Sequence, residues 1–272
     1  MKVTLFGCGG WGSRVAAKLA TFDDVRLVVV DADHDRVQHV AKELGCGCSS
    51  DPYGYLGVTG TADDSVMGGR VVIATPPSER AQLVRAVLGG YGPKPIAIRI
   101  VKPLAETADE AAQIVQMCED AGVALTVGFT LLHHPLYAAA FAYMNATGAT
   151  PIHVDAVRIG KPARHAANAF VDAGIHAAAV AAYLNVPAGI SAAYDPLAAL
   201  RVTRIYTSGG KVVVDELAGT VTTPHGEIGV HDGDALATEL DAWLTGTHRG
   251  TPAVAVEAQR IVDTHVECGV AA

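Results

Sequence analysis

A glycine-rich segment near the start of the chain has the spacing of a loop that binds a dinucleotide diphosphate. Gly7, Gly9 and Gly12 form a G-x-G-x-x-G pattern between a short apolar run, Val3–Phe6, and a segment of helical periodicity. In such a loop the first glycine allows a tight turn, the second lets backbone approach the diphosphate, and the third lets helix and strand pack closely. The helix N-terminus then presents backbone N–H groups to the phosphate charge. The residues expected to line the cofactor are Gly7, Gly9, Gly10, Trp11 and Gly12.

An acidic residue ends the next apolar run and extends this pattern. Asp31 follows Arg26–Val30, which has the β-branched composition of a strand that is buried on both faces. A carboxylate at this point can bind both hydroxyls of the adenosine ribose. A 2′-phosphate would meet like charge at close range there, so Asp31 favours NAD over NADP.

Polar residues also follow two later buried runs. Thr75 and Pro76 come after Val71–Ala74, and Lys102 comes after Ile96–Val101. The carboxyl ends of parallel strands meet at one edge of a sheet, where ligands bind. We therefore expect Thr75, Pro76 and Lys102 beside the cofactor, where the lysine ammonium would stabilise a developing alkoxide.

A carboxylate and an imidazole recur at helical spacing in the second half of the chain. Asp172 and His176 lie within Asp172–Leu184, whose pattern predicts a helix that places both on one face. A histidine with a pKa near neutrality suits removal of the hydroxyl proton when a carbinol is oxidised. Asp172 could orient the imidazole ring or bind a substrate hydroxyl. The two residues are candidates for the catalytic end of the site.

The order of these segments predicts the fold. Residues 1–128 alternate strand and helix patterns, which implies a doubly wound parallel sheet of the Rossmann type. Residues 129–272 instead contain consecutive strand-like runs separated by glycine turns, which predicts mainly antiparallel pairing. The expected class is α/β, in which the Rossmann domain is followed by a smaller α+β domain. That second domain is expected to hold a sheet of about four or five strands.

Taken together, these motifs resemble one known family. Thr75-Pro76-Pro77, Lys102-Pro103 and Gly128-Phe129, with Asp172-x-x-x-His176, are similar to segments of the glucose–fructose oxidoreductase/inositol dehydrogenase/MocA (Gfo/Idh/MocA) family. The segment Phe129–Pro135 looks like one common in its nucleotide-sugar members. The resemblance covers nearly the whole chain.

The resemblance implies a site and an assembly. It places Lys102 and His176 beside the reacting carbon of a small, sugar-like substrate, because many members oxidise or reduce sugars, inositols or nucleotide sugars. It also implies that the second-domain sheet is open-faced and that a homodimer or homotetramer forms through the exposed face of this sheet. In function, it implies an NAD(P)-dependent dehydrogenase or reductase that acts on CH–OH groups.

Several positions depart from the family pattern. The family's E-K-P reads Val101-Lys102-Pro103, its frequent histidine after T-P-x is Arg80, and alanines follow His176 where an acid is often found. Fewer polar groups near His176 weaken the case for a polyhydroxylated substrate. Two alternatives therefore stay open, a reductase of a non-sugar C=O or C=N group and a non-catalytic regulatory protein that binds NAD.

The composition narrows the classes of function and of cellular environment that remain. The formal net charge of −8 argues against broad nucleic-acid binding, which needs an excess of lysine and arginine. A long uncharged stretch, Ala173–Tyr194, contains His176, Asn185 and Pro187, which favours a buried helix and strand over a membrane span. Five scattered cysteines favour a reducing cytoplasm over a disulfide framework. No histidine or cysteine pair has metal-ligand spacing, so no metal is expected. The cysteines are Cys8, Cys46, Cys48, Cys118 and Cys268.

Overall fold

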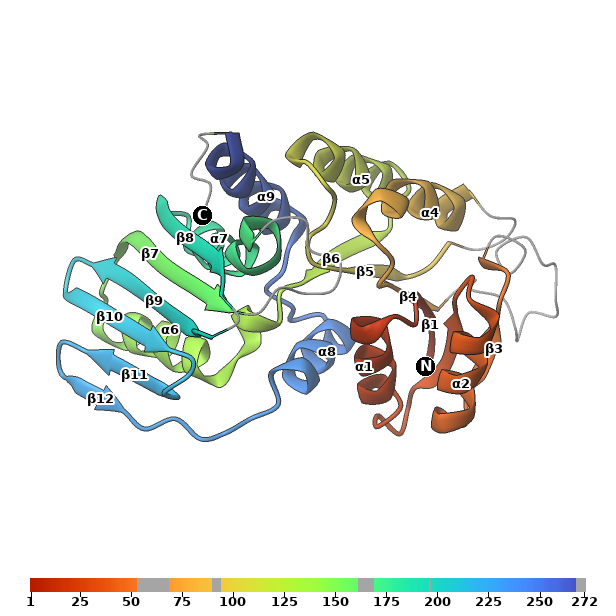
Figure 1. The fold of residues 1–272 in the computed structure, drawn as a ribbon, viewed down its shortest axis with the longest axis horizontal. Coiled ribbons are helices and arrows are strands. Elements are labelled where there is room, and N and C mark those ends of the chain that lie inside the picture. Colours follow the sequence, from red (N-terminus) through yellow and green to blue (C-terminus); the bar gives the residue numbers. More distant parts are fainter. Residues whose placement is uncertain (53–68, 90–93, 161–168, 196, 268–272) are drawn as a thin grey trace. The chain divides into compact units, whose positions relative to one another are not determined.

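The protein forms two compact units, Met1–Gly128 and Phe129–Ala272 (Figure 1). The computed structural model describes residues 1–52, 69–89, 94–160, 169–195 and 197–267, so Cys268 lies outside the described residues. None of the described helices combines the length and the apolar character needed to cross a bilayer.

The first unit is a parallel six-stranded sheet in the order β3-β2-β1-β4-β5-β6, and every pairing in it is parallel. This confirms the doubly wound Rossmann class. The order reverses between β1 and β4, and ligands bind at the carboxyl edge of such a switch point. The strands are β1 (Lys2–Phe6), β2 (Arg26–Val30), β3 (Gly47–Ser49), β4 (Arg70–Ile73), β5 (Ala97–Val101) and β6 (Ala124–Gly128). The helices are α1 (Gly10–Leu19), α2 (His34–Leu44), α4 (Pro77–Gly89) and α5 (Ala108–Asp120).

The central strands of this sheet are almost entirely buried because helices pack on both faces. All five residues of β5 are buried, including the charged side chain of Arg99. The segment of Cys46 and Cys48, whose glycine and serine content favours a turn, contributes β3 at the sheet edge. Three residues are too few to show a strand pattern, and their pairing with β2 supplies the hydrogen bonds that decide the conformation.

The second unit holds a six-stranded sheet in the order β12-β11-β10-β9-β7-β8. The expectation of about four or five strands was therefore wrong, and β12 is the three-residue strand that the sequence pattern did not reveal. The strands are β7 (Pro151–Gly160), β8 (Ala188–Tyr194), β9 (Leu200–Thr207), β10 (Gly210–Asp215), β11 (Thr220–Thr223) and β12 (Gly226–Ile228). The helical elements are η1 (Thr130–His133), α6 (Pro135–Thr147), η2 (Phe170–Gly174), α7 (Ile175–Leu184), α8 (Ala235–Thr245) and α9 (Pro252–Glu267).

Pairing in this sheet is mostly antiparallel, as predicted, with one exception. β7 and β8 are parallel because the chain crosses from one to the other through α7, and a helical crossover returns the chain in the same direction. β7 also pairs with β9, in antiparallel register. β7, which precedes α7 in the chain, and β8, which follows it, lie side by side in the sheet.

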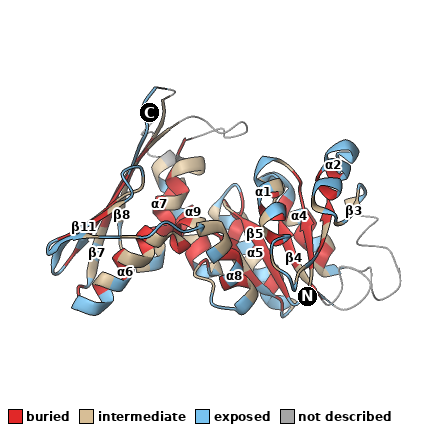
Figure 2. Cartoon of the chain, turned by 90° about the horizontal axis from the view of Figure 1, so that it is seen from below, coloured by how far each residue is buried: buried red, intermediate tan, exposed pale blue. Residues whose placement is uncertain are grey.

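Only one face of the second sheet is covered by helices in the described part of the unit, as Figure 2 shows. α6 contacts β10 and β11, and α7 contacts β7 and β8. Along β7, Val154, Ala156 and Arg158 are buried on the covered face, whereas His153 and Asp155 alternate with them and are half-buried. The sheet is thus open on one side, as the sequence predicts.

Candidate active site

The glycine loop between β1 and α1 is fixed by close backbone contacts at two of its glycines. Gly7 has a φ of +95°, and a Cβ there would lie 2.8 Å from the carbonyl carbon of Ala74. A Cβ on Gly12 would lie 1.9 Å from the Gly7 oxygen. By contrast, a Cβ on Gly9 or Gly10 would meet nothing within 4 Å. The first and last glycines are therefore required by the fold, while the middle pair borders open space.

The N-terminus of α1 opens onto this same space. Gly9 is its N-cap, no side chain caps the helix, and its first turn contains no acidic residue. The first backbone N–H groups of an α-helix have no partner within the helix and carry partial positive charge. The cradle thus fits the diphosphate of a dinucleotide. Trp11 stands at its rim with 40 % of its surface exposed.

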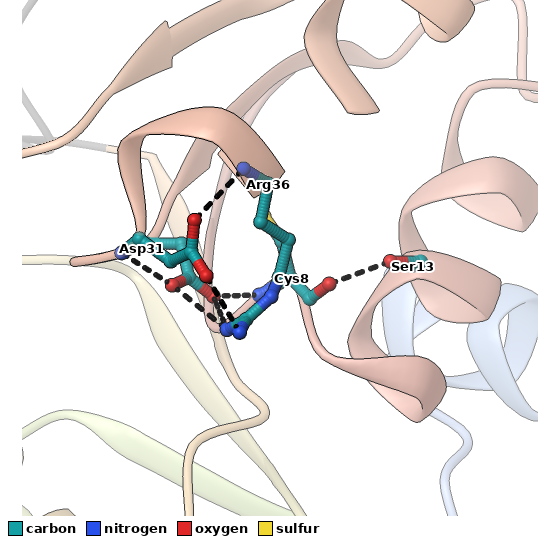
Figure 3. A network of polar contacts seen from close by, with 5 residues as sticks. Cys8, Ser13, Asp31 and Arg36 are labelled. Atoms are coloured by element: carbon teal, nitrogen blue, oxygen red, sulfur yellow. Dashed lines mark hydrogen bonds and ion pairs between the residues drawn. The ribbon is translucent and has the colours of Figure 1, made fainter. Parts of the chain in front are cut away.

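Asp31 is held beside the loop by three groups (Figure 3). Its carboxylate accepts hydrogen bonds from the backbone N–H of Cys8 at 2.6 Å and of Asp33 at 2.9 Å. Arg36, on the first turn of α2, reaches it with Nη1 at 3.2 Å and also pairs with Asp33 at 2.8 Å. Asp31 is 9 % exposed, so the carboxylate is oriented by neighbours and is still accessible at one edge. Sequence reasoning found Asp31 but missed Cys8 and Arg36.

Cys8 contributes backbone and not thiolate chemistry. Burial, followed by the nearby Asp31 carboxylate, raises the pKa of its thiol to about 12. A thiol with this pKa stays protonated at neutral pH and is a poor nucleophile. It therefore carries no negative charge toward a bound diphosphate. The hydroxyl of Ser13 donates to the Cys8 carbonyl at 2.7 Å and holds the loop from the helix side.

The ends of β4 and β5 bring Thr75 and Lys102 to the carboxyl edge of the sheet. The Thr75 hydroxyl is buried and has no hydrogen-bond partner among the described residues. Lys102 follows the last residue of β5 and is half-buried, and Pro76 is exposed. Between these strand ends lies Arg80, whose guanidinium donates to the carbonyl oxygens of both Thr75 and Val101.

In the second unit, Asp172 and His176 occupy two kinds of helix and not one. Asp172 lies in the π-helical turn η2, and His176 lies in the first turn of α7. The sequence predicts one continuous α-helix here, and Gly174, a poor helix former, marks the change between the two forms. Single π-turns inside helices are frequent at functional sites. Both side chains are half-buried.

Tyr194 is a further candidate near Asp172 that the sequence did not reveal. It ends β8 and is paired with Gly160, so its side chain lies on the covered face of the sheet, toward η2. Its hydroxyl is buried and has no hydrogen-bond partner among the described residues. Burial, followed by the Asp172 carboxylate, raises its pKa to about 12, which places a protonated phenol near Asp172. No local pattern connects the two, because the sheet and the π-turn bring them together.

The neighbouring histidines have structural roles. His134 caps α6, because its Nδ1 accepts the Leu136 N–H at 3.2 Å. His133 is 5 % exposed, accepts the Arg249 N–H and stacks on His248 with ring centroids 4.6 Å apart. Within the described residues, no group of three or more histidine, cysteine, aspartate or glutamate side chains could hold a metal ion.

Comparison with known proteins follows the same division of the chain. Residues 1–129 match the family model GFO_IDH_MocA, described as "Oxidoreductase family, NAD-binding Rossmann fold". A curated relative, D-xylose 1-dehydrogenase (NADP(+)) 2 of Haloferax volcanii, is 31 % identical over 137 residues. That match covers 50 % of this chain and only 39 % of the relative, so it spans well under half of the relative's length.

Solved structures match both units. UDP-N-acetylglucosamine 3-dehydrogenase GnnA from Acidithiobacillus ferrooxidans superposes with a TM-score of 0.81 at 19 % identity, covering 97 % of this chain and 96 % of its own. KijD10, a 3-ketoreductase from Actinomadura kijaniata solved with NADP and TDP-benzene, gives a TM-score of 0.76 at 16 % identity. The coverage in that case is 97 % of this chain and 96 % of KijD10. At these identities the likeness establishes the two-domain fold.

Proposed function

We propose that the chain is an NAD(P)-dependent oxidoreductase of the Gfo/Idh/MocA type, whose family model residues 1–129 match, and that it transfers hydride between nicotinamide and a carbinol or carbonyl carbon of a sugar or nucleotide sugar. The observation that carries the proposal is the cradle of the first unit. Gly7 and Gly12 are required by close backbone contacts, and the open space at Gly9 and Gly10 faces an uncapped helix N-terminus. Asp31 is oriented at its border.

Each site residue has a role that its chemistry allows. Bound nicotinamide would accept or supply the hydride. Lys102 would donate a hydrogen bond to the substrate oxygen and stabilise negative charge that develops there. His176 would take the hydroxyl proton at a ring nitrogen during oxidation and return it during reduction. Asp172 would bind a substrate hydroxyl or orient the imidazole, and the Thr75 hydroxyl would bind the cofactor.

The cofactor is proposed to be NAD. The Asp31 carboxylate suits two ribose hydroxyls and opposes a 2′-phosphate. Arg36 lies against the same carboxylate and offers a cation that would partly offset this repulsion. We therefore expect NADH to bind more tightly than NADPH by about tenfold, corresponding to about 1.4 kcal/mol. Asp31→Asn is expected to remove the preference, whereas substitution of the exposed Asp35 on α2, Asp35→Asn, should keep it.

The decisive experiment combines binding and turnover. NADH fluorescence is titrated with the wild type, and turnover is then measured with UDP-N-acetylglucosamine, D-xylose, myo-inositol and a set of simple keto compounds. Binding followed by turnover that falls strongly in Lys102→Ala supports the enzyme. Binding without any turnover, unchanged by Lys102→Ala, supports a regulatory protein that uses NAD as a ligand. No binding of either reduced nucleotide refutes both.

One observation favours a second candidate, a reductase of a non-sugar C=O or C=N group. Ala177, Ala178 and Ala179 follow His176 on α7 and are fully buried. Val101 stands where the resembled family has glutamate. None of these positions carries a polar side chain that could bind a polyhydroxylated substrate. If the keto compounds are turned over and none of the sugars is, the result would favour the non-sugar reductase.

The open sheet face of the second unit supports a proposed homodimer or homotetramer. Leu200 and Tyr206 lie on the uncovered side, in register with Ile159 and His153, and are 38 % and 36 % exposed. A sheet face that carries large apolar side chains gains free energy when a second copy covers it. Light scattering is expected to give a mass of at least two chains, and a monomeric mass would refute this assembly.

A further inference from the structure

A buried cation, Arg80, lies at the carboxyl edge of the first sheet. Arg80 lies on the first turn of α4, and 2 % of its surface is exposed. Burial lowers its pKa to about 9. Among the described residues no carboxylate pairs with it, although buried charges are normally paired. The guanidinium therefore needs another explanation for its place in the fold.

The hydrogen bonds of Arg80 join two strand ends. Nε and Nη2 donate to the carbonyl oxygen of Thr75 at 3.0 and 2.8 Å, and Nη1 donates to that of Val101 at 2.8 Å. A guanidinium is a rigid planar fork, so hydrogen bonds donated from different edges of the plane constrain the separation of the two acceptors. The ladder between β4 and β5 ends at Ile73 and Ile100, and beyond it this one side chain joins Thr75 to Val101.

Each of the joined carbonyls is next to a group of the proposed site. Thr75 itself carries the buried hydroxyl that lacks a partner among the described residues. Val101 is the residue directly before Lys102. A shift of either strand end would move one of these groups relative to the other. Misplacement of a catalytic group by about 1 Å can reduce the rate by about 10².

We propose that Arg80 is a positioning residue whose guanidinium fixes Lys102 relative to Thr75 at the edge of the sheet where nicotinamide binds. The inference rests on the proposed function, because it assigns Arg80 an effect that operates through Lys102. Lysine at this position would keep the charge but offer one compact ammonium in place of a fork, so it would hold one carbonyl and release the other. Histidine, the residue frequent here in the resembled family, offers only two ring nitrogens.

The test is a double-mutant cycle on turnover. Arg80→Lys is expected to lower kcat about tenfold with the KM of the substrate nearly unchanged, and Arg80→His is expected to act in the same direction. In a Lys102→Ala background the same substitutions are expected to change kcat less than twofold, because the group that they misplace is gone. Arg85→Lys is the matched control, since Arg85 lies on the same helix and is exposed.

The possible outcomes separate this inference from the function on which it rests. Equal fold-changes in the wild-type and Lys102→Ala backgrounds would show that Arg80 acts only on general stability and would overturn the inference. Urea unfolding identifies a variant that does not fold, and the other substitution then carries the cycle. A wild type that binds NADH but turns over no substrate overturns the proposed function and this inference together. Normal wild-type turnover with an additive cycle overturns this inference alone.

Discussion

The cofactor cradle of the first unit and the Asp172 cluster of the second unit, defined as Asp172, His176 and Tyr194, are built in different ways. The cradle is made of backbone, and steric contacts at Gly7 and Gly12 dictate its residues. The cluster is made of side chains that a π-turn, a helix and a strand bring together. A substitution at a close backbone contact of the cradle disturbs the fold itself. In the Asp172 cluster, by contrast, one side chain can be replaced and its chemical group removed while the fold is kept. The comparison therefore separates loss of fold from loss of chemistry.

The largest expected effect comes from Gly12→Ala. The added Cβ would overlap the Gly7 oxygen, so we expect loss of measurable NADH binding and about 1–3 kcal/mol lower stability to urea unfolding. Gly10→Ala is the matched variant, since its Cβ meets no protein atom within 4 Å. It should leave the urea midpoint unchanged or raise it slightly, yet weaken NADH binding. Equal stability losses in both variants would contradict the steric account.

His176→Ala tests whether turnover can be lost through the second unit while cofactor binding is kept. Removal of the proposed proton acceptor is expected to lower kcat by about 10² to 10⁴, with NADH fluorescence titration unchanged. The control is His225→Ala, because His225 is exposed and contacts Tyr143. Near-normal turnover of His176→Ala would remove His176 from the site.

Tyr194→Phe sharpens the comparison further. The phenol has no partner among the described residues, so removal of its hydroxyl is expected to leave stability unchanged or slightly raised. If the hydroxyl binds substrate beside Asp172, KM should rise about five- to tenfold. Tyr206→Phe on the open sheet face serves as the control. A loss of stability with normal kinetics would assign Tyr194 to packing.

The smallest effect concerns the His134 cap of α6. Burial lowers the pKa of His134 below its usual value, with Glu216 as a weaker opposing cause. The unfolded chain therefore binds this proton more readily than the folded one, and stability falls as pH drops from above 6.5 through the folded pKa. A protonated Nδ1 also cannot accept the Leu136 N–H, so the cap is lost. We expect about 0.5–1 kcal/mol less stability from this group at pH 5 than at pH 7.5. His134→Asn, which keeps a cap without titrating, should flatten that difference in urea unfolding.

The sequence predicts what depends on local pattern. The glycine loop, Asp31 and the strand ends that carry Thr75 and Lys102 follow from residue types whose backbone needs are specific. The strands β3 and β12 could not be predicted, because three residues show no periodicity and only a neighbouring strand makes them extended. The π-turn at Asp172 could not be predicted either, because the residue pattern does not distinguish a π-turn from a turn of α-helix.

The missed site residues are those whose roles arise from tertiary contact. Arg80 reads as a departure from a family pattern, and its two carbonyl partners become apparent only when β4 and β5 lie side by side. Tyr194 reads as the end of a strand, and the crossover through α7 makes it a neighbour of Asp172. A sequence shows which residues have suitable chemistry, whereas the topology decides which of them meet.

The hydrogen bond from the Cys8 N–H to Asp31 has a consequence for recognition. It joins the loop proposed to bind the diphosphate to the carboxylate proposed to bind the ribose, so the two halves of the proposed nucleotide site are held at a fixed spacing. Such preorganisation lowers the entropy lost when a ligand arrives. We therefore expect a nucleotide to associate rapidly with this unit and to cause little rearrangement of its backbone.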